Sequence, residues 1–221
     1  DQSVIGVPSI EEQKILINTN NKITLLKDEL SNCSNELSIN PKNASIIEDK
    51  LDGLLGELSM LSDSDKVNRI VRKGEYTTRE FKETLSLCIH RKIKDKEIER
   101  MVLKTIGAFL NTDGGELLVG VNDSGEILGV DKEIDIFHKN IDKFLLHFKN
   151  LLQSAIGEDF YPFVKYKVVN VNFKNILWIT CNASPAPCYL NNKDFYVRTN
   201  PATDKLEGPK MVDYINNHFD K

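Results

Sequence analysis

The chain has 221 residues, of which 40% are hydrophobic and 28% charged, with a formal net charge of −4 at pH 7. This composition is ordinary for a globular protein, and the length allows one core of ordinary size plus an appendage. No apolar run approaches the roughly 18 residues that a membrane span needs, and no signal peptide is recognisable, so we expect a cytoplasmic protein without a membrane partner.

The charge is divided unevenly along the chain. Up to Asp65 there are 5 lysine and arginine residues against 12 acidic residues, a net charge of −7. The remainder holds the other 24 basic and 21 acidic residues, a net charge of +3. The two parts therefore have different roles. The positive excess is a weak indication of nucleic-acid binding, because such binding depends on where the cations cluster.

The four cysteines show neither the Cys-x-x-Cys pairing nor the histidine spacing of a metal site. We therefore expect Cys33, Cys88, Cys181 and Cys188 to be reduced structural thiols. The sequence begins at Asp1 rather than at a methionine, and we expect it to be a fragment of a longer protein.

Residues 1–65 are predicted to form an antiparallel helical hairpin, a coiled-coil arm. Ser9 and Glu12 have the spacing of a capping box, and Pro41 interrupts the helical pattern. Before the proline, apolar residues recur at heptad spacing, and after it a second seam alternates steps of four and three. The seam residues are Leu16, Ile23, Leu26, Leu30, Cys33 and Leu37, then Ile47, Leu51, Leu54, Leu58 and Leu61. Such an arm can join two copies of the chain or bind partner helices.

The polar segment Ser62–Asp65 is the predicted boundary, and residues 66–221 are predicted to form one globular domain. Hydrophobic periodicity predicts both helices and strands in it. The helices are Val67–Arg72, Asp95–Leu110, Glu133–Leu152 and Pro209–His218, and the strands are Glu75–Thr84, Leu117–Val121, Glu126–Val130, Val164–Val171, Ile176–Cys181 and Phe195–Arg198. Strands outnumber crossover helices, so we expect an α+β fold with a mixed, largely antiparallel sheet.

Three carboxylates and a lysine are the candidate catalytic groups: Glu75, Glu80, Asp123 and Lys82. Residues five apart on a strand point to opposite faces, so the two glutamates can converge only through a bend at the threonines between them. Carboxylates from separate elements are typical ligands of Mg²⁺ or Mn²⁺, which can activate water against a phosphate, with the lysine adding positive charge. Alternatively, the glutamates are surface acids and Asp123 is a turn residue of the loop Asn122–Gly125.

Two groups of cations are candidates for binding phosphate. The cations of the first group fall within six residues. The two lysines of the second group alternate with apolar residues along one predicted strand, so their side chains share one face of it. The groups are Arg91, Lys92, Lys94 and Lys96, and Lys165 and Lys167. Either alone is also typical of a solvated surface. Trp178 is predicted to lie in the sheet core, whereas Phe195 and Tyr196 could offer a base-stacking surface. No Gly-x-x-x-x-Gly-Lys-Ser/Thr loop occurs, so we expect no nucleotide cofactor.

Three motifs stand in a fixed order: Glu-x-x-x-x-Glu-Phe-Lys at Glu75–Lys82, Phe-x-Asn-Thr-x-Gly-Gly at Phe109–Gly115, and Gly-Val-x-Asp at Gly120–Asp123. Together they resemble the Schlafen family and its bacterial relatives with an AlbA-like domain. The strand Tyr196–Arg198 and the following Thr203 resemble the stretch with which bacterial members commonly close.

The resemblance implies a metal-dependent RNase site in which Glu75, Glu80 and Asp123 hold the ion and Lys82 lies beside them. It also implies that the turn Phe109–Gly115 supports the site. Two departures stand out. Leu110 occupies a place where a small residue is frequent, and Asn122 replaces a common aspartate.

Residues Ile5–Ile15, which lead into the first heptad helix, resemble the exit from a target-recognition domain into a spacer helix in type I restriction specificity subunits. This second resemblance implies an upstream portion that recognises DNA, and a restriction or defence setting.

Two hypotheses follow. In the first, the domain is a metal-dependent nuclease, with RNA favoured over DNA, in which Lys82, Arg198 and the cation groups grip phosphates. In the second, it binds DNA or RNA without cutting, as a regulatory module attached to a DNA-recognition or modification protein. A Glu80→Gln change separates them, since only a nuclease loses product while keeping its binding.

Overall fold

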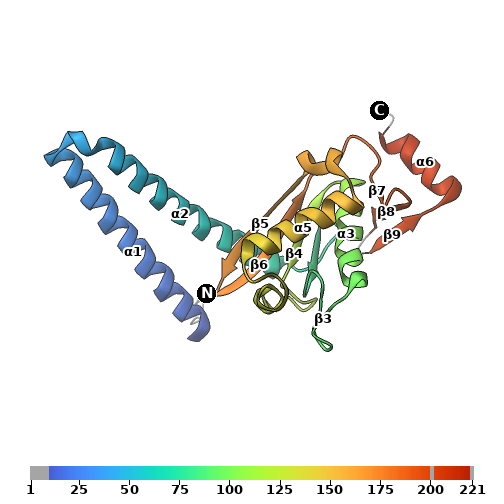
Figure 1. Ribbon diagram of the computed structural model, residues 1–221, viewed down its shortest axis with the longest axis horizontal. Coiled ribbons are helices and arrows are strands. Elements are labelled where there is room, and N and C mark those ends of the chain that lie inside the picture. Colours follow the sequence, from blue (N-terminus) through green and yellow to red (C-terminus); the bar gives the residue numbers. More distant parts are fainter. Residues whose placement is uncertain (1–9, 200–201, 220–221) are drawn as a thin grey trace, which may run out of the picture. The chain divides into compact units, whose positions relative to one another are not determined.

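The computed structural model describes residues 10–199 and 202–219 (Figure 1). The chain divides into two compact units, one ending at Asp63 and the other beginning at Ser64. Within the described ranges, no helix combines the length and apolar character that crossing a membrane requires. The predicted capping box at Ser9 and the spacer-like segment from Ile5 begin outside the described residues.

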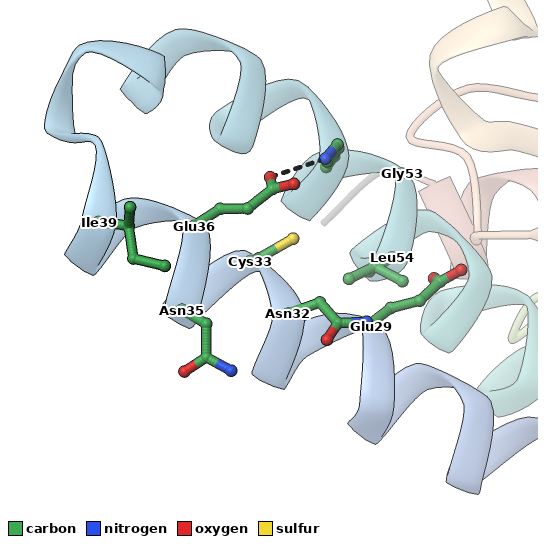
Figure 2. A pocket seen from close by; sticks show the side chains of 9 residues that line it. Glu29, Asn32, Cys33, Asn35, Glu36, Ile39, Gly53 and Leu54 are labelled. Atoms are coloured by element: carbon green, nitrogen blue, oxygen red, sulfur yellow. Dashed lines mark hydrogen bonds and ion pairs between the residues drawn. The ribbon is translucent and has the colours of Figure 1, made fainter.

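The first unit contains one whole helix and the greater part of a second, which continues into the second unit, and the two helices contact each other. α1 (Ile10–Ile39) and α2 (Ala44–Lys73) are joined by a short 3-10 helix, η1 (Pro41–Asn43), at the predicted break. Lys50 donates a hydrogen bond to Glu36 at 2.9 Å (Figure 2). Among the seam residues whose side chains the structure describes, four are buried: Leu26, Cys33, Ile47 and Leu54. The predicted contact between the helices is confirmed, whereas the coiled-coil arm stays a prediction.

α2 continues through Ser62–Asp65, where the sequence predicted a turn followed by a separate short helix. These polar residues include neither proline nor glycine, so they do not interrupt the helix. Val67 and Ile70 just beyond them are buried in the core of the second unit, and this packing favours the helical continuation.

The second unit is α+β and contains a mixed four-stranded sheet. The strands lie in the order β1 (Arg79–Lys82), β4 (Gly115–Val119), β6 (Lys174–Cys181) and β5 (Val164–Val171). β1 pairs parallel with β4, whereas β6 pairs antiparallel with both β4 and β5. The predicted α+β class is confirmed, and β5 has the predicted bounds.

Both faces of this sheet bury apolar residues. One face packs against α3 (Lys96–Leu110) and α5 (Ile141–Ala155) in the larger core. On the other face, Phe81 and Trp178 pack with Val67 from the end of α2. Successive residues of a strand point to opposite faces, so neighbours along β1 lie in different surroundings.

The remaining strands are short. β2 (Leu87–Cys88) and β3 (Ile93–Lys94) form a hairpin, and β7 (Tyr189–Leu190), β8 (Asp194–Arg198) and β9 (Thr203–Leu206) form an antiparallel sheet that is followed by α6 (Gly208–Phe219). β8, α6 and α3 confirm the predicted elements to within a residue or two. β2, β3, β7 and β9 were not predicted, because strands of so few residues carry too little periodicity.

Two predicted strands are wrong in extent. The segment Glu75–Thr84 is a strand only at β1. The predicted hairpin strand Glu126–Val130 is reduced to an isolated bridge between Val121 and Ile127. Its ladder ends there because Leu128 and Gly129 both donate to the Gly120 carbonyl, at 2.8 and 2.9 Å.

The predicted helix Glu133–Leu152 is divided into three pieces: α4 (Asp131–Glu133), a π-helical turn η2 (Ile134–His138), and α5. Lys139 interrupts it with a left-handed conformation, φ 69°. Asn140 then caps α5 by accepting from the Lys143 amide at 2.9 Å. A 3-10 helix, η3 (Glu158–Phe163), leads into β5.

Candidate functional site

Strand β1 sets the positions of Glu80 and Lys82. Phe81 between them is fully buried on the sheet face that the end of α2 covers, so alternation turns Glu80 and Lys82 toward the opposite face. Their register partners on β4 are Leu117 and Val119, which lie in the larger core. Because β1 is an outer strand, the carboxylate and the ammonium group lie at the edge of the sheet.

Arg198 on β8 joins Glu80 to the turn before β1. The arginine side chain is 1% exposed, and its Nη1 donates to Glu80 Oε2 at 2.9 Å and to the Thr203 hydroxyl at 2.8 Å. Its Nε and Nη2 donate to the carbonyls of Thr77 and Tyr76, each at 3.0 Å. A guanidinium with these internal partners is not available to a phosphate. The structure therefore gives Arg198 a structural role in place of the predicted nucleic-acid contact.

Lys82 neutralises the second oxygen of Glu80. Its Nζ donates to Glu80 Oε1 at 2.6 Å and to the Phe81 carbonyl at 2.8 Å. The Lys82 and Glu80 side chains are 18% and 16% exposed, so the pair is partly shielded from water. Charge-assisted hydrogen bonds of this kind are stronger than exposed ion pairs. Both oxygens of Glu80 are thus in use, each with a cation.

The predicted bend between the two glutamates is confirmed. Residues 77–78 form a turn that is closed by reciprocal backbone hydrogen bonds between Tyr76 and Arg79, both at 3.0 Å. The turn brings Glu75 back to β1, where its Oε1 accepts from the Phe81 amide at 2.8 Å. This hydrogen bond fixes the first glutamate beside the strand that carries the second.

The carboxyl group of Glu75 has a raised pKa. Glu75 as a residue is exposed, but its carboxyl group is folded back onto β1, and this partial burial is the largest cause of the increase. The Phe81 amide lowers the pKa, whereas the negative charges of Glu80 and Asp123 raise it. Glu75 therefore lies close enough to Glu80 and to Asp123 to interact with each of them electrostatically.

Asp123 lies exposed in the loop that follows β4. The loop is closed by Asn122, whose Oδ1 accepts from the Ser124 hydroxyl and from the Glu126 amide, both at 2.8 Å. The turn chemistry that the sequence left open for Asp123 is thus supplied by Asn122. The hydrogen bonds that close the loop do not involve the Asp123 carboxylate. A substitution of Asp123 should therefore have little effect on the free energy of unfolding.

The acids as arranged do not fit a preformed Mg²⁺ or Mn²⁺ site. Both Glu80 oxygens accept from cations, and one Glu75 oxygen accepts from an amide. Across residues 10–199 and 202–219, no three His, Cys, Asp or Glu side chains come together closely enough to hold a metal ion. A ligand set made of the three acids requires Glu80 to be released from Lys82 or Arg198.

The first predicted group of cations lies on the β2–β3 hairpin and the start of α3, at the periphery of the second unit (Figure 1). The exposed residues are Arg91, Lys92, Lys94 and Lys96. Lys92 forms the turn with φ 53°, and its amide donates to the Cys88 carbonyl at 2.7 Å. Arg91 pairs with Asp95 at 2.7 Å, and Lys94 Nζ lies 5.4 Å from the centre of the Phe137 ring. The structure brings these four cations onto one short segment.

The second group lies elsewhere. Lys165 and Lys167 are exposed on β5, the outer strand at the opposite edge from β1. Lys167 is in register with Trp178, and the same row of register partners across the sheet ends at Phe81 on β1. The Lys167 Nζ lies 5.0 Å from the centre of the indole ring system. This row is on the face that the end of α2 covers. Lys165 and Lys167 are therefore not brought together with Lys82.

The segment Phe109–Gly115 serves the fold. Asn111 is fully buried, and its Nδ2 donates to the carbonyls of Cys188 and Tyr196 at 2.8 and 2.9 Å, while its Oδ1 accepts from the Cys188 amide at 2.7 Å. These bonds tie the end of α3 to β8 and to the segment before β7. Phe195 and Tyr196 are buried, so the predicted base-stacking surface is wrong.

Sequence reasoning missed Glu133, which is almost completely buried. Its carboxylate accepts from the Leu85 amide at 2.9 Å, from the Ser86 amide at 2.8 Å and from the Ser86 hydroxyl at 2.5 Å. Burial raises the pKa of Glu133, and these hydrogen bonds lower it. Glu133 thus holds the segment that leads from β1 to the hairpin. A single acid in a short helix carries no periodic or motif signal by which it could have been found.

Comparison with known proteins identifies the family of the second unit. The family model described as Schlafen, AlbA_2 matches residues 75–207, which is more than half of the chain. No curated protein matches. Among solved structures, the chain is similar to the DIP2311 protein from Corynebacterium diphtheriae, with 17% identity and a TM-score of 0.47, over 64% of this chain and 24% of that one. On the family match, which contains all three sequence motifs, this chain belongs to the Schlafen AlbA_2 family.

Proposed function

We propose that the second unit binds nucleic acid and that the cations of the β2–β3 hairpin contact the phosphate backbone. The exposure of Arg91, Lys92, Lys94 and Lys96 on one short segment carries this proposal. Lysine and arginine are the usual partners of phosphate oxygens, and such contacts position a protein on nucleic acid without reading its sequence. Membership of the Schlafen AlbA_2 family and the net charge of +3 beyond Asp65 support it.

The proposal assigns unequal weight to the predicted cations. Lys82 and Arg198 both donate to the Glu80 carboxylate, so each is already engaged by a partner within the domain. Lys165 and Lys167 lie on another part of the sheet, and any contribution from them is separable from that of the hairpin. We therefore expect the hairpin to dominate affinity and its salt dependence.

The test is a titration of labelled single-stranded RNA, tRNA and duplex DNA, followed by fluorescence anisotropy at several salt concentrations. For duplex DNA each phosphate contact contributes about 0.9 to the slope of log K against log salt, so a Lys92→Ala/Lys94→Ala variant should lower that slope by up to about 2. Lys42→Ala is the matched control, since Lys42 is an exposed lysine of the first unit. An unchanged slope in the hairpin variant would contradict the proposal.

Metal-dependent cleavage, with RNA as the favoured substrate, is the second candidate function. The observation that favours it is that Glu75 folds back onto β1 beside the other acids: burial is the main cause of its raised pKa, and the negative charges of Glu80 and Asp123 add to it. Clustered carboxylates with a raised pKa attract cations. Against it stands the balance of Glu80 by Lys82 and Arg198, so cleavage is the weaker of the two candidates.

The variant Asp123→Asn tests cleavage without disturbing the fold, because the Asp123 carboxylate is exposed and the loop is closed by Asn122. The assay measures products from the same nucleic acids with Mg²⁺, with Mn²⁺ and with a chelator. Metal-dependent product that disappears in Asp123→Asn, with binding unchanged, would establish the nuclease. Binding without product supports the non-cleaving module.

The setting of the module is also a proposal. The resemblance of residues Ile5–Ile15 to the spacer entry of type I restriction specificity subunits supports attachment to a DNA-recognition or modification protein in restriction or defence. Co-purification of the full-length protein with a DNA-modifying partner tests this setting, and a full-length protein with no DNA-recognition portion contradicts it.

A further inference from the structure

Two isoleucines of the β2–β3 hairpin are exposed within a segment that is otherwise rich in cations. Ile89 is 44% exposed and Ile93 is 46% exposed. From Cys88 to Lys96 the chain has four lysine and arginine residues and one acidic residue, Asp95. Single exposed apolar side chains are common on proteins, but these two lie within five residues of each other among the cations. As exposed groups they add little to the stability of the fold.

The pairing of the two strands turns Ile93 away from the domain. Cys88 is the register partner of Ile93, and paired residues share one face of a hairpin. Leu87 precedes Cys88 on the strand and is buried, so the opposite face is the one that lies against the domain. Ile89 lies in the turn, and the hairpin projects at the edge of the second unit (Figure 1). Both isoleucines are therefore accessible to a partner.

Internal hydrogen bonds fix the shape of the hairpin. At its base, the Asp95 amide donates to the Ser86 carbonyl at 2.8 Å, and the Ser86 amide donates to the buried Glu133 carboxylate at 2.8 Å. In the turn, the Lys92 amide donates to the Cys88 carbonyl at 2.7 Å. A ribbon that is already fixed loses little conformational freedom when it binds a partner.

We propose that the hairpin enters the major groove of duplex DNA, where Ile89 and Ile93 contact the methyl groups of thymine. The inference rests on the proposed function, phosphate binding by the same hairpin. Charge complementarity selects nucleic acid as the partner of the isoleucines. Ile93 lies between Lys92 and Lys94 along the chain, and Ile89 is two positions from Arg91. The cations that contact phosphates thus lie on either side of the apolar groups that contact bases.

The size of a two-stranded ribbon selects the groove. The major groove of B-DNA is about 12 Å wide and admits such a ribbon, whereas the minor groove is only about 6 Å wide. The major groove of duplex RNA is deep and too narrow for side chains to read. On the base edges of the DNA major groove, the apolar group is the thymine methyl, which uracil lacks. Duplex DNA with A·T pairs is therefore the ligand that suits both the cations and the isoleucines.

The test compares alternating d(AT) and d(AU) duplexes of equal length, which have the same charge and differ only in the thymine methyl groups. Fluorescence anisotropy measures the binding of the intact chain to each duplex and to an alternating r(AU) duplex. Because thymine occurs at every base pair, the comparison does not depend on where the protein sits along the duplex.

The test variant is Ile89→Ser/Ile93→Ser, which removes both apolar side chains and keeps every cation of the hairpin. The matched control is Val212→Ser, because Val212 is a β-branched residue of α6 that is 50% exposed. Circular dichroism checks that each variant keeps the fold of the wild type.

The proposal expects the wild type to bind d(AT) more tightly than d(AU), by about fourfold for each buried methyl group, and more tightly than r(AU). Ile89→Ser/Ile93→Ser should lose this preference and keep the salt dependence of binding, while Val212→Ser behaves as the wild type does. Equal wild-type affinities for d(AT) and d(AU), or tighter binding to r(AU), overturns the inference and leaves the proposed function standing. Absence of binding to every nucleic acid overturns the proposed function and the inference with it.

An anionic lipid surface also attracts apolar groups that lie beside cations, so cosedimentation with phosphatidylserine vesicles completes the test. Vesicle binding that is lost in Ile89→Ser/Ile93→Ser, together with equal affinities for d(AT) and d(AU), assigns the isoleucines to a membrane and overturns the inference. A preference for d(AT) that is lost in the same variant supports it.

Discussion

Replacing Glu80 by glutamine removes the negative charge between Arg198 and Lys82 while keeping the shape of the side chain. The buried guanidinium then loses its balancing carboxylate, and the new amide group meets the Lys82 ammonium, donor against donor. Breaking a fully buried pair costs about 3–5 kcal/mol, and a hydrogen bond to a charged group contributes about 1.5–3 kcal/mol. Glu80 is partly exposed and glutamine keeps one acceptor, so we expect the free energy of unfolding to fall by about 2–3 kcal/mol.

Urea denaturation followed by tryptophan fluorescence measures this loss. The chain has one tryptophan, Trp178, and it lies in the sheet of the second unit, so its fluorescence reports on that unit. With an m-value of about 2 kcal/mol/M, the Glu80→Gln midpoint should move down by about 1–1.5 M urea. Glu83→Gln is the control, because Glu83 is an exposed acid three positions along the chain, and its midpoint should stay within about 0.3 M.

The opposite result would refute the structural role of Glu80. If the carboxylate were only a surface acid or an idle metal ligand, its removal would relieve its repulsion of Glu75. The midpoint would then be unchanged or higher.

Three further outcomes are expected. Burial, with smaller effects of Lys94 and His147, lowers the pKa of His138 from 6.5 to about 4. Between pH 6.5 and pH 4 the unfolded chain holds the His138 proton and the folded chain does not, so the free energy of unfolding should fall by roughly 2–3 kcal/mol from pH 7 to pH 4. Urea denaturation at both pH values measures this loss, which should be smaller in His138→Phe. Asn111→Ala leaves two carbonyls and an amide without partners and should cost about 3 kcal/mol or more in urea unfolding, whereas an unchanged midpoint would contradict its anchoring role. Gly114→Ala places a Cβ 2.4 Å from the Cys181 carbonyl oxygen at φ 77° and should lower the free energy of unfolding by at least about 2 kcal/mol, so a wild-type melting temperature would contradict the observed turn.

The longer elements were predictable because their periodicity extends over several turns or pleats. α3 buries eight residues between Val102 and Leu110, and β5 alternates between less and more exposed residues from Val164 to Val168, so both were found with nearly correct bounds. The division of the helix near Lys139 was not predictable from periodicity, since the apolar pattern continues through the left-handed residue. The hairpin β2–β3 was missed because its strands have two residues each.

The candidate site shows the same division between local and distant information. The family pattern selected Glu80 and Lys82, and local turn chemistry indicated the bend before β1. The partner that decides the state of Glu80 is Arg198, which is 118 positions away along the chain. No local pattern reports a contact at that distance, so an arginine that the sequence assigned to nucleic acid proved to be a buried counter-ion. The proposed role of Lys92 and Lys94 requires only that their side chains are exposed, and a cluster of charges in the sequence does indicate exposure.

The most direct test of nucleic-acid binding by the hairpin is the affinity of the wild-type chain and of Lys92→Ala/Lys94→Ala for the same labelled nucleic acid at about 50 mM salt. Loss of two phosphate contacts predicts binding weaker by about tenfold, with the difference shrinking as salt rises, while Lys42→Ala binds as the wild type does. Equal affinities for the wild type and the hairpin variant at every salt concentration would contradict the account and would assign the phosphate contacts to another surface.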